Sequence, residues 1–235
     1  MSLTRRRMIG SALAVPLPAE TAKAGKVLVA GGHPGDPECG CAGTILRYRE
    51  AGAEVVLLYL NRGEGYCGGA KLEDCAAIRT REAQNACQIL GCRAAFAGQY
   101  DGRAVVDGAH YEAFARILGA ERPDVVFTQW PIDRHRDHRA VSMLTLDAWL
   151  AGGRKFALYY YEVAEDTMMF SPTDYVDISA MESRRRSACF AHVSQQPETW
   201  YPKQVEITRR RGVESGVAQA EAFRHHPESP RAVLP

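Results

Sequence analysis

The chain has 235 residues, of which 46% are hydrophobic and 24% are charged, a balance that suits a globular domain with a sizeable core. Its formal net charge is +1, so it lacks the basic field typical of nucleic-acid-binding proteins. No apolar run approaches the roughly 20 residues of a transmembrane helix. We therefore expect neither a nucleic-acid partner nor stable membrane insertion.

The N-terminal segment has the features of a twin-arginine export signal, in the expected order. Three arginines at 5–7 precede a mildly apolar stretch at 8–19, and Ala-Lys-Ala at 22–24 gives a small-x-small cleavage pattern. The alternative is a basic tail with no role in targeting. We expect residues 1–24 to be a signal peptide, residues 25–235 to be one domain, and the protein to be periplasmic or extracellular.

Strand-like and helix-like segments then alternate along the chain. Apolar, β-branched runs predict strands over 26–32, 54–60, 94–99, 124–129, 156–163 and 175–178. Helical periodicity predicts helices over 42–51, 76–90, 111–118, 138–150, 181–192 and 216–223. The glycine-rich segment 61–74 predicts a long loop of the active-site type, and the tail after Phe223 should be irregular. This alternation predicts an α/β fold with a mostly parallel, doubly wound sheet.

Two polar clusters follow strands of this predicted sheet, namely 33–36 (His-Pro-Gly-Asp) and 135–138 (His-Arg-Asp-His). Ligand sites in such sheets lie at the carboxyl ends of the strands, so the two clusters should share one site. A single histidine would more readily be a hydrogen-bonded structural residue, but three ligand-type residues favour a metal. We predict His33, Asp36 and His138 as ligands of one Zn²⁺ per chain, with an open fourth position.

A zinc site of this kind predicts metal-assisted hydrolysis, in which a carboxylate accepts the proton of the attacking water. A second group then protonates the leaving nitrogen. His135 is a candidate for this acid, or for a donor to the oxyanion. Asp137 either orients His135 or is the N-cap of the helix that starts near His138, and the local sequence does not decide between these roles.

These motifs resemble the PIG-L/LmbE-like N-acetylglucosamine deacetylases, a zinc-dependent group with a Rossmann-like fold. The family's Ala-His-Pro-Asp-Asp-Glu corresponds to 32–38 (Gly-His-Pro-Gly-Asp-Pro-Glu), and its His-Pro-Asp-His corresponds to 135–138. Weaker similarities occur at 62–64, 79–83, 90–91, 192–195 and 220–224. The resemblance extends from Val27 to Arg224 and implies a single Rossmann-like domain with helices on both faces of the sheet.

The resemblance also implies roles for individual residues. His33, Asp36 and His138 would hold zinc, His135 would be the electrostatic and acid catalyst, and Asp137 would support His135. The substrate would be a small molecule or a glycoconjugate that carries an N-acylated amino sugar.

An arginine of the 79–83 segment is expected near this substrate. Either Arg79 or Arg81 fits, and a surface ion pair with Glu82 is the alternative for both. We assign Arg81 to substrate binding, together with Arg62, which follows the second predicted strand.

Gly35 is the departure from the family, because the first aspartate of the Asp-Asp pair is the family's general base. Another carboxylate, Glu38 or Glu64, would have to replace it, although Glu38 also suits a helix N-terminus and Glu64 a solvated loop. Otherwise the reaction proceeds with weak assistance, at a cost of about 10²–10⁴-fold in rate. The alternative function is a zinc-containing carbohydrate-binding protein with little or no turnover. A nucleotide-binding domain is disfavoured, since 31–35 (Gly-Gly-His-Pro-Gly) does not give G-x-G-x-x-G.

Seven cysteines leave at least one without an intramolecular partner. We interpret Cys39 and Cys41 as small buried residues at the start of a helix. Cys67 and Cys75 lie in the 61–74 region and are close enough in sequence to form a disulfide. Trp130, Trp200 and the aromatic run at 156–161 are candidates for a pocket wall, with core packing as the default.

Overall fold

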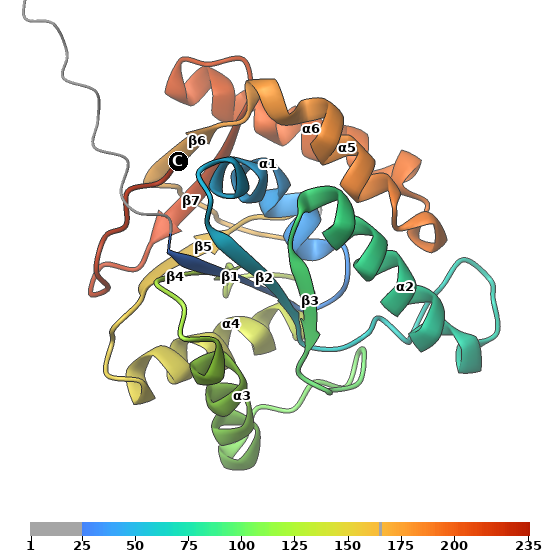
Figure 1. Ribbon diagram of the computed structural model, residues 1–235. Helices are drawn as coiled ribbons and strands as arrows, with labels where there is room; N and C mark the ends of the chain where they lie inside the picture. The colour runs from blue at the N-terminus through green and yellow to red at the C-terminus, as the bar shows by residue number, and fades with distance from the viewer. Residues whose placement is uncertain (1–24, 165) are drawn as a thin grey trace, which may run out of the picture.

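The structure is a computed structural model that describes residues 25–164 and 166–235 (Figure 1). The predicted signal peptide lies outside the described residues.

Seven strands form one sheet in the order β3-β2-β1-β4-β5-β7-β6. Their bounds are β1 (Lys26–Gly31), β2 (Glu54–Tyr59), β3 (Arg93–Phe96), β4 (Val125–Gln129), β5 (Ala157–Tyr161), β6 (Asp174–Asp177) and β7 (Ala220–His225). The first five strands pair in parallel, whereas β7 is antiparallel to both β5 and β6. The prediction of a mostly parallel α/β sheet in a single domain is confirmed.

Helices cover both faces of this sheet (Figure 1). They are α1 (Asp36–Glu50), α2 (Leu72–Leu90), α3 (Gly108–Glu121), α4 (Arg136–Ala151), α5 (Glu182–Phe190) and α6 (Pro197–Ser215), with short 3₁₀ turns η1 (Ser179–Met181) and η2 (Val193–Gln195). Figure 1 shows α1, α2, α5 and α6 on one side, and α3 and α4 on the other.

The core consists of two apolar layers, one on each face of the sheet. Val29 and Phe127 belong to the layer that includes residues of α1 and α2. Their neighbours Leu28 and Val126 belong to the layer that includes residues of α3 and α4. This division follows from the strand geometry, because successive side chains point to opposite faces. Both faces of the central strands are buried, which explains their continuous apolar sequences.

The prediction of a helix over 216–223 is wrong. Gly216 adopts the left-handed conformation (φ 80°) and ends α6, and the chain then continues as β7. Helix α6 itself was missed, because Pro197 and Pro202 argue against a helix. Pro197 is tolerated since it stands in the first turn, where its missing N–H has no intrahelical partner. One feature of the sequence does indicate a helix here, namely the helical spacing of the residues that α6 buries, which include Tyr201, Gln204, Thr208 and Arg211.

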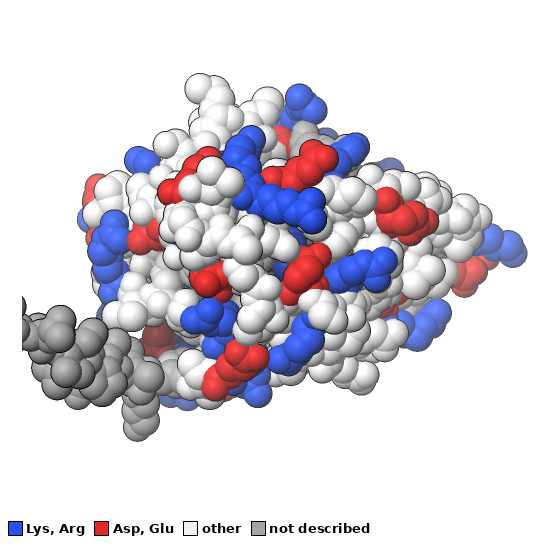
Figure 2. All heavy atoms as spheres, turned by 90° about the horizontal axis from the view of Figure 1, so that it is seen from above, with Lys and Arg blue, Asp and Glu red and all other residues white. Residues whose placement is uncertain are grey.

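The surface agrees with the near-neutral net charge. In Figure 2, lysines and arginines are interspersed with aspartates and glutamates over the face that lies uppermost in Figure 1. Among the described residues, every helix is too short or too polar to cross a bilayer.

Candidate active site

The site lies at the carboxyl ends of the parallel strands, where the direction of winding reverses. Strand β1 leads into α1 on one face, and its neighbour β4 leads into α4 on the other. The two connections diverge and leave a crevice between them, which is the usual ligand site of doubly wound sheets. A cavity of about 340 Å³ opens there, and His33, Asp36, His135 and His138 are among its lining residues.

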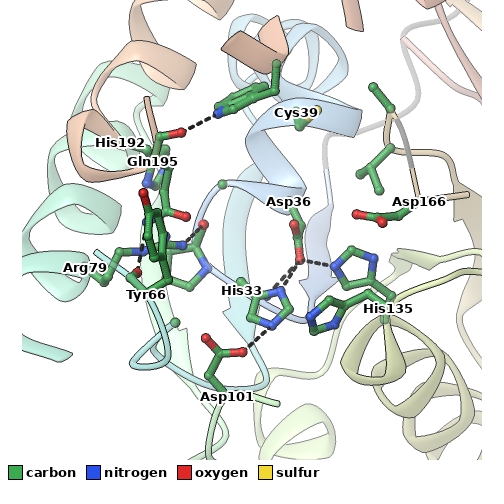
Figure 3. Close-up of a pocket in the computed structure, with 17 residues that line it drawn as sticks. His33, Asp36, Cys39, Tyr66, Arg79, Asp101, His135, Asp166, His192 and Gln195 are labelled. Carbon is green, nitrogen blue, oxygen red and sulfur yellow. Dashed lines mark hydrogen bonds and ion pairs between the residues drawn. The ribbon is translucent and has the colours of Figure 1, made fainter. Parts of the chain in front are cut away.

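The three predicted metal ligands converge on one carboxylate oxygen. Oδ2 of Asp36 lies 3.1 Å from Nδ1 of His33 and 3.2 Å from Nε2 of His138 (Figure 3). The same oxygen accepts a hydrogen bond of 2.8 Å from the backbone N–H of His33, which fixes the carboxylate against the turn. Residues about a hundred positions apart in sequence are thus brought into one cluster, as the sequence predicted.

Two glycines make this convergence possible. A Cβ atom at Gly32 would lie 3.0 Å from Cδ2 of His138 and 3.3 Å from Oδ2 of Asp36, so a side chain there would press on the cluster. Gly35 has φ 108°, a conformation that L-residues rarely adopt, and it caps the N-terminus of α1. Gly35 lines the cavity. A Cβ atom built on Gly35 would have Cδ2 of His192, at 3.9 Å, as its nearest neighbour. The pocket therefore has space where the family carries an aspartate.

Further carboxylates orient the histidines. Oδ2 of Asp137 and Oδ1 of Asp101 lie 3.2 and 3.0 Å from Nε2 of His33. On the other side, Oδ1 of Asp133 lies 3.0 Å from Nδ1 of His138. Each candidate ligand is thus held through the ring nitrogen opposite to the one that faces Asp36. Metal-binding histidines are commonly held in this way.

The cluster is strongly anionic. Burial by itself would lower the pKa of His33, but the carboxylates of Asp36, Asp101 and Asp137 hold that pKa well above its ordinary value. The same competition raises the pKa of His138 to about 9. Burial would raise the pKa of Asp36, yet the two histidines hold it well below its usual range. Carboxylates that raise the pKa of two imidazoles in this way form an environment that a divalent cation would stabilise in place of the imidazole protons.

The donor atoms suit zinc in type and spacing. The predicted set is held together through Oδ2 of Asp36, which lies 3.1 Å from Nδ1 of His33 and 3.2 Å from Nε2 of His138. Within the described ranges, two further sets that lack Asp36 have donor atoms within 4.8 Å of one another, namely His33 with His135 and His138, and His33 with Asp101 and Asp137. Imidazole nitrogen and carboxylate oxygen are the donors of catalytic zinc sites. The residues present therefore fit the metal that the sequence predicted.

His135 is placed to present a proton to the cavity. Its Nδ1 accepts a hydrogen bond of 3.2 Å from the backbone N–H of Asp137, so the neutral ring carries its proton on Nε2. The ring lies edge-on to that of His33, with centroids 4.5 Å apart. Burial lowers the pKa of His135, and the neighbouring His33 and His138 act in the same direction.

Of the two roles predicted for Asp137, the N-cap role is wrong. The N-cap of α4 is His135, and Asp137 lies inside the helix. Its buried Oδ2 accepts hydrogen bonds from Nδ2 of Asn61 (2.9 Å) and the N–H of Gly102 (2.8 Å), besides facing His33. Asp137 therefore supports His135 through its backbone and orients His33 through its carboxylate.

The two predicted substrate-binding arginines do not line the cavity. Arg81 is exposed, whereas Arg79 is 3% exposed, lines the cavity and donates a hydrogen bond of 2.5 Å to the carbonyl of Pro34. Arg79, and not the predicted Arg81, is therefore the arginine of this helix that lies at the cavity, because residues two apart in a helix face different sides. Arg62 is exposed as well, with its guanidinium 5.5 Å from the ring of Phe96.

Several lining residues were not predicted. They are Tyr66, Asp101 and Asp166, together with His192 and Gln195, which belong to the weak similarity at 192–195 and carry no predicted role. Trp200, a predicted candidate for the pocket wall, also lines the cavity, and its Nε1 donates to the carbonyl of Gln195 at 3.1 Å. Trp130 instead packs against Tyr160 and Phe170. The missed signal is positional, since Asp101 and Asp166 also follow parallel strands.

The long loop is fastened beside the cavity. A disulfide joins Cys67 to Cys75, and the side-chain amide of Gln195 donates to the carbonyl of Tyr66 at 3.0 Å. Cys39 and Cys41 are buried in α1, as interpreted from the sequence.

Comparison with known proteins identifies relatives of this arrangement. The family model described as "PIG-L: GlcNAc-PI de-N-acetylase" matches residues 28–149, which is about half of the chain. Diacetylchitobiose deacetylase of Thermococcus kodakarensis is 28% identical over 225 residues, which cover 86% of this chain and 83% of that protein.

Solved structures share the fold. The conserved protein TT1542 from Thermus thermophilus has a TM-score of 0.76 and 31% identity, over 88% of this chain and 96% of that one. N,N'-diacetylchitobiose deacetylase from Pyrococcus horikoshii has a TM-score of 0.77 and 24% identity, over 87% and 86% of the two chains. At this identity the second comparison supports the Rossmann-like fold rather than a shared substrate.

Proposed function

The chain belongs to the PIG-L family, and on that premise we propose that it is a zinc-dependent hydrolase that removes an N-acetyl group from an amino sugar or a sugar-containing substrate. Its relatives are deacetylases, so it is an amidohydrolase that acts on N-acetyl bonds. The observation that carries the proposal is the position of the Asp36 carboxylate between His33 and His138 in an open cavity.

His33, Asp36 and His138 would hold the zinc ion. When bound, zinc supplies a Lewis acid that polarises the amide carbonyl and makes water more acidic. The surrounding carboxylates, Asp101 and Asp137, keep the His33 ring in one orientation. This rigidity matters because a catalytic metal needs a fixed open position for the substrate.

His135 would act on the leaving group. Its Nε2–H is a hydrogen-bond donor at the cavity, since Nδ1 is occupied by the backbone of Asp137. It can therefore stabilise charge that develops on the carbonyl oxygen, and in its protonated form it can donate a proton to the departing nitrogen.

The rest of the cavity suits a sugar ring. Trp200 and Tyr66 supply aromatic surface, while Arg79 and Gln195 supply polar groups. Nε of Arg79 is buried without a hydrogen-bond partner among the described residues, so it has a donor to offer. A volume of about 340 Å³ is at the small end of ligand pockets, in keeping with one or two sugar rings.

The test is release of free amine from N-acetylglucosamine and N,N'-diacetylchitobiose by zinc-loaded protein. Asp36→Ala is the negative control, and Asp147→Asn, on a half-buried residue of α4, is the control for mutation itself. We expect turnover in the wild type and Asp147→Asn, and none in Asp36→Ala. Turnover that persists in Asp36→Ala would contradict the assigned site.

The missing side chain at Gly35 favours one alternative, a zinc-containing carbohydrate-binding protein without turnover. The same assay separates the two. One zinc per chain with saturable sugar binding and no amine release would support the binding protein.

We also propose export of the protein. Besides the twin-arginine pattern, the Cys67–Cys75 disulfide supports this, because disulfides persist in oxidising compartments. Fractionation of the source cells tests it, with recovery of the uncleaved chain in the cytoplasm as the contrary result.

A further inference from the structure

Hydrolysis by this site needs a proton acceptor that Gly35 cannot supply. We infer that Asp166, which follows β5, is the general base that accepts the proton of the attacking water. This inference rests on the proposed function. The other carboxylates near the cavity are engaged in structural contacts, which leaves Asp166 for this role.

Glu38 is committed to the structure. It is fully buried, and its Oε1 accepts a hydrogen bond of 2.7 Å from the hydroxyl of Tyr59 and lies 3.0 Å from Nε2 of His192. Its Oε2 accepts a hydrogen bond from the N–H of Gly35 at 3.0 Å. Both oxygens are engaged away from the cavity, so Glu38 cannot receive a proton from bound water without breaking the cap of α1.

Glu64 and Asp101 are also engaged. Oε2 of Glu64 accepts from the backbone N–H groups of Arg62 and Asp101, and Glu64 is not among the residues that line the cavity. Asp101 does line it, but its Oδ1 lies 3.0 Å from Nε2 of His33 and its Oδ2 accepts from the N–H of Gly65 at 2.9 Å. Asp101 therefore orients a ligand.

Asp166 differs from all of these. It lines the cavity, and Figure 3 shows its carboxylate directed toward Asp36 on the side of His135. Within 25–164 and 166–235, no side-chain hydrogen bond to this carboxylate is found. A half-buried carboxylate that faces a catalytic cavity without a protein donor is free to accept a proton from water.

The backbone around Asp166 is fixed to the loop that carries the second cluster. The carbonyl of Asp166 accepts a hydrogen bond of 2.9 Å from the N–H of Arg134. The next residue, Thr167, forms a β-bridge with Asp133 and donates its hydroxyl to Oδ2 of that residue at 3.0 Å. Because Asp133 also holds His138, one set of bonds positions both the base and a ligand.

The surroundings of Asp166 make it a better proton acceptor than an exposed aspartate. Burial raises the pKa of its carboxyl above the ordinary value. Asp133 and Asp36 act in the same direction, while His138 and His135 oppose them when protonated. A base with a raised pKa takes up a proton more readily.

The chemical step then balances. The water oxygen bonds to the carbonyl carbon as one water proton passes to the Asp166 carboxylate. The C–N bond breaks, and the nitrogen takes a proton from protonated His135, which gives acetic acid and free amine. The acetic acid then releases its remaining proton to solvent as acetate. The proton on Asp166 returns to His135 through solvent, so both groups regain their starting state.

The experiment compares zinc-loaded wild type, Asp166→Asn, Asp166→Ala and the Asp147→Asn control, on a substrate that the wild type hydrolyses. For Asp166→Asn we expect kcat to fall by about 10²–10⁴-fold, with KM within about threefold and one zinc per chain retained. Formate, a small carboxylate that fits the vacated volume, should raise kcat of Asp166→Ala at least about tenfold. A purely structural role would not give such rescue.

Two results overturn the inference alone. One is a kcat for Asp166→Asn within about threefold of the active wild type. The other is loss of activity that parallels loss of zinc or of the folded state. A wild type that binds zinc but hydrolyses nothing would instead overturn the proposed function, and the inference with it.

Discussion

Oδ2 of Asp137 lies 3.2 Å from Nε2 of His33, although 104 positions separate the two residues in sequence. The contact joins the first polar cluster to the second. The Asp137 carboxylate is fixed in turn by Asn61 and Gly102, so its charge is directed at the His33 ring. Such a carboxylate orients a metal-binding imidazole and makes it a stronger donor.

Replacement of Asp137 by asparagine should therefore weaken metal binding without removing a ligand. We expect zinc affinity to fall by about 10–100-fold, because the charge and the alignment of His33 are lost together. Competition with a chelator of known affinity measures this, with Asp147→Asn as the control. An unchanged zinc affinity would show that the contact has no role in the metal site.

The ligands themselves should behave differently. Alanine at His33, Asp36 or His138 should abolish stoichiometric binding, whereas the wild type should hold one zinc per chain. Metal analysis of gel-filtered protein gives the ratio directly. Full zinc content in His138→Ala would rule out the assigned ligand set.

A buried ion pair outside the site gives a prediction for stability. Arg185 is completely buried, with Nε 3.6 Å from Oε1 of Glu221, whose oxygens also accept from the N–H groups of Gly43 and Thr44. Arg185→Met should destabilise the fold by about 3–5 kcal/mol, because the Glu221 charge is then left buried and unpaired. Denaturant unfolding at pH 7 measures the loss, and adding Glu221→Gln to this variant should recover part of it.

The pH dependence of this loss has a definite sign. Burial raises the pKa of the Glu221 carboxyl above 4.5 even beside Arg185. A carboxyl whose pKa is raised by folding destabilises the folded protein at pH values above that raised pKa, at which the buried group is ionised. Protonation at lower pH removes the cost. The difference between wild type and Arg185→Met should therefore be full at neutral pH and shrink as the pH falls toward about 4.5. A difference that grows on acidification would contradict this account.

The Cys67–Cys75 disulfide should stabilise the protein and shape the pocket. The disulfide joins residues 8 positions apart, and by restricting the unfolded chain it should contribute about 2–3 kcal/mol to the free energy of unfolding. Replacing both cysteines by serine should lower the melting temperature. It should also raise KM more than it lowers kcat, because Tyr66 lies in this loop. Equal kinetic constants in the two forms would show that the loop is positioned without the disulfide.

The sequence alone predicted the parallel strands of the sheet, though not β7, and the three residues that meet at its edge. Buried parallel strands have long apolar runs, and the residues that follow them must meet at the carboxyl edge, so His33 and His138 could be placed together. The prediction failed where the outcome depends on helical phase, as it did for Arg79 and Arg81. Helix α6 was not predicted because its two prolines lower the helix propensity of the segment, and packing against the rest of the protein stabilises the helix instead.

The roles of the carboxylates could not be predicted for a different reason. Glu38, Asp101 and Asp166 all follow parallel strands in sequence. Their oxygens differ only in which donors the folded loops bring to them, as with the N–H of Gly35 for Glu38 and that of Gly65 for Asp101. Such long-range contacts have no periodic pattern in the sequence.

Gly35→Asp tests whether the family's usual base can be restored. The position has room, since His192 at 3.9 Å is the nearest side chain to a Cβ atom, but its φ of 108° strains any L-residue. We expect a loss of about 1–3 kcal/mol in stability and no gain in rate in the presence of Asp166. Gly52→Asp is the matched control, because Gly52 has φ 86° and no atom within 4 Å of a Cβ. A tenfold or greater rise in kcat would show that the reaction still lacks a competent base and that Asp166 does not supply one, whereas an unchanged kcat in a less stable protein would support Asp166 in that role.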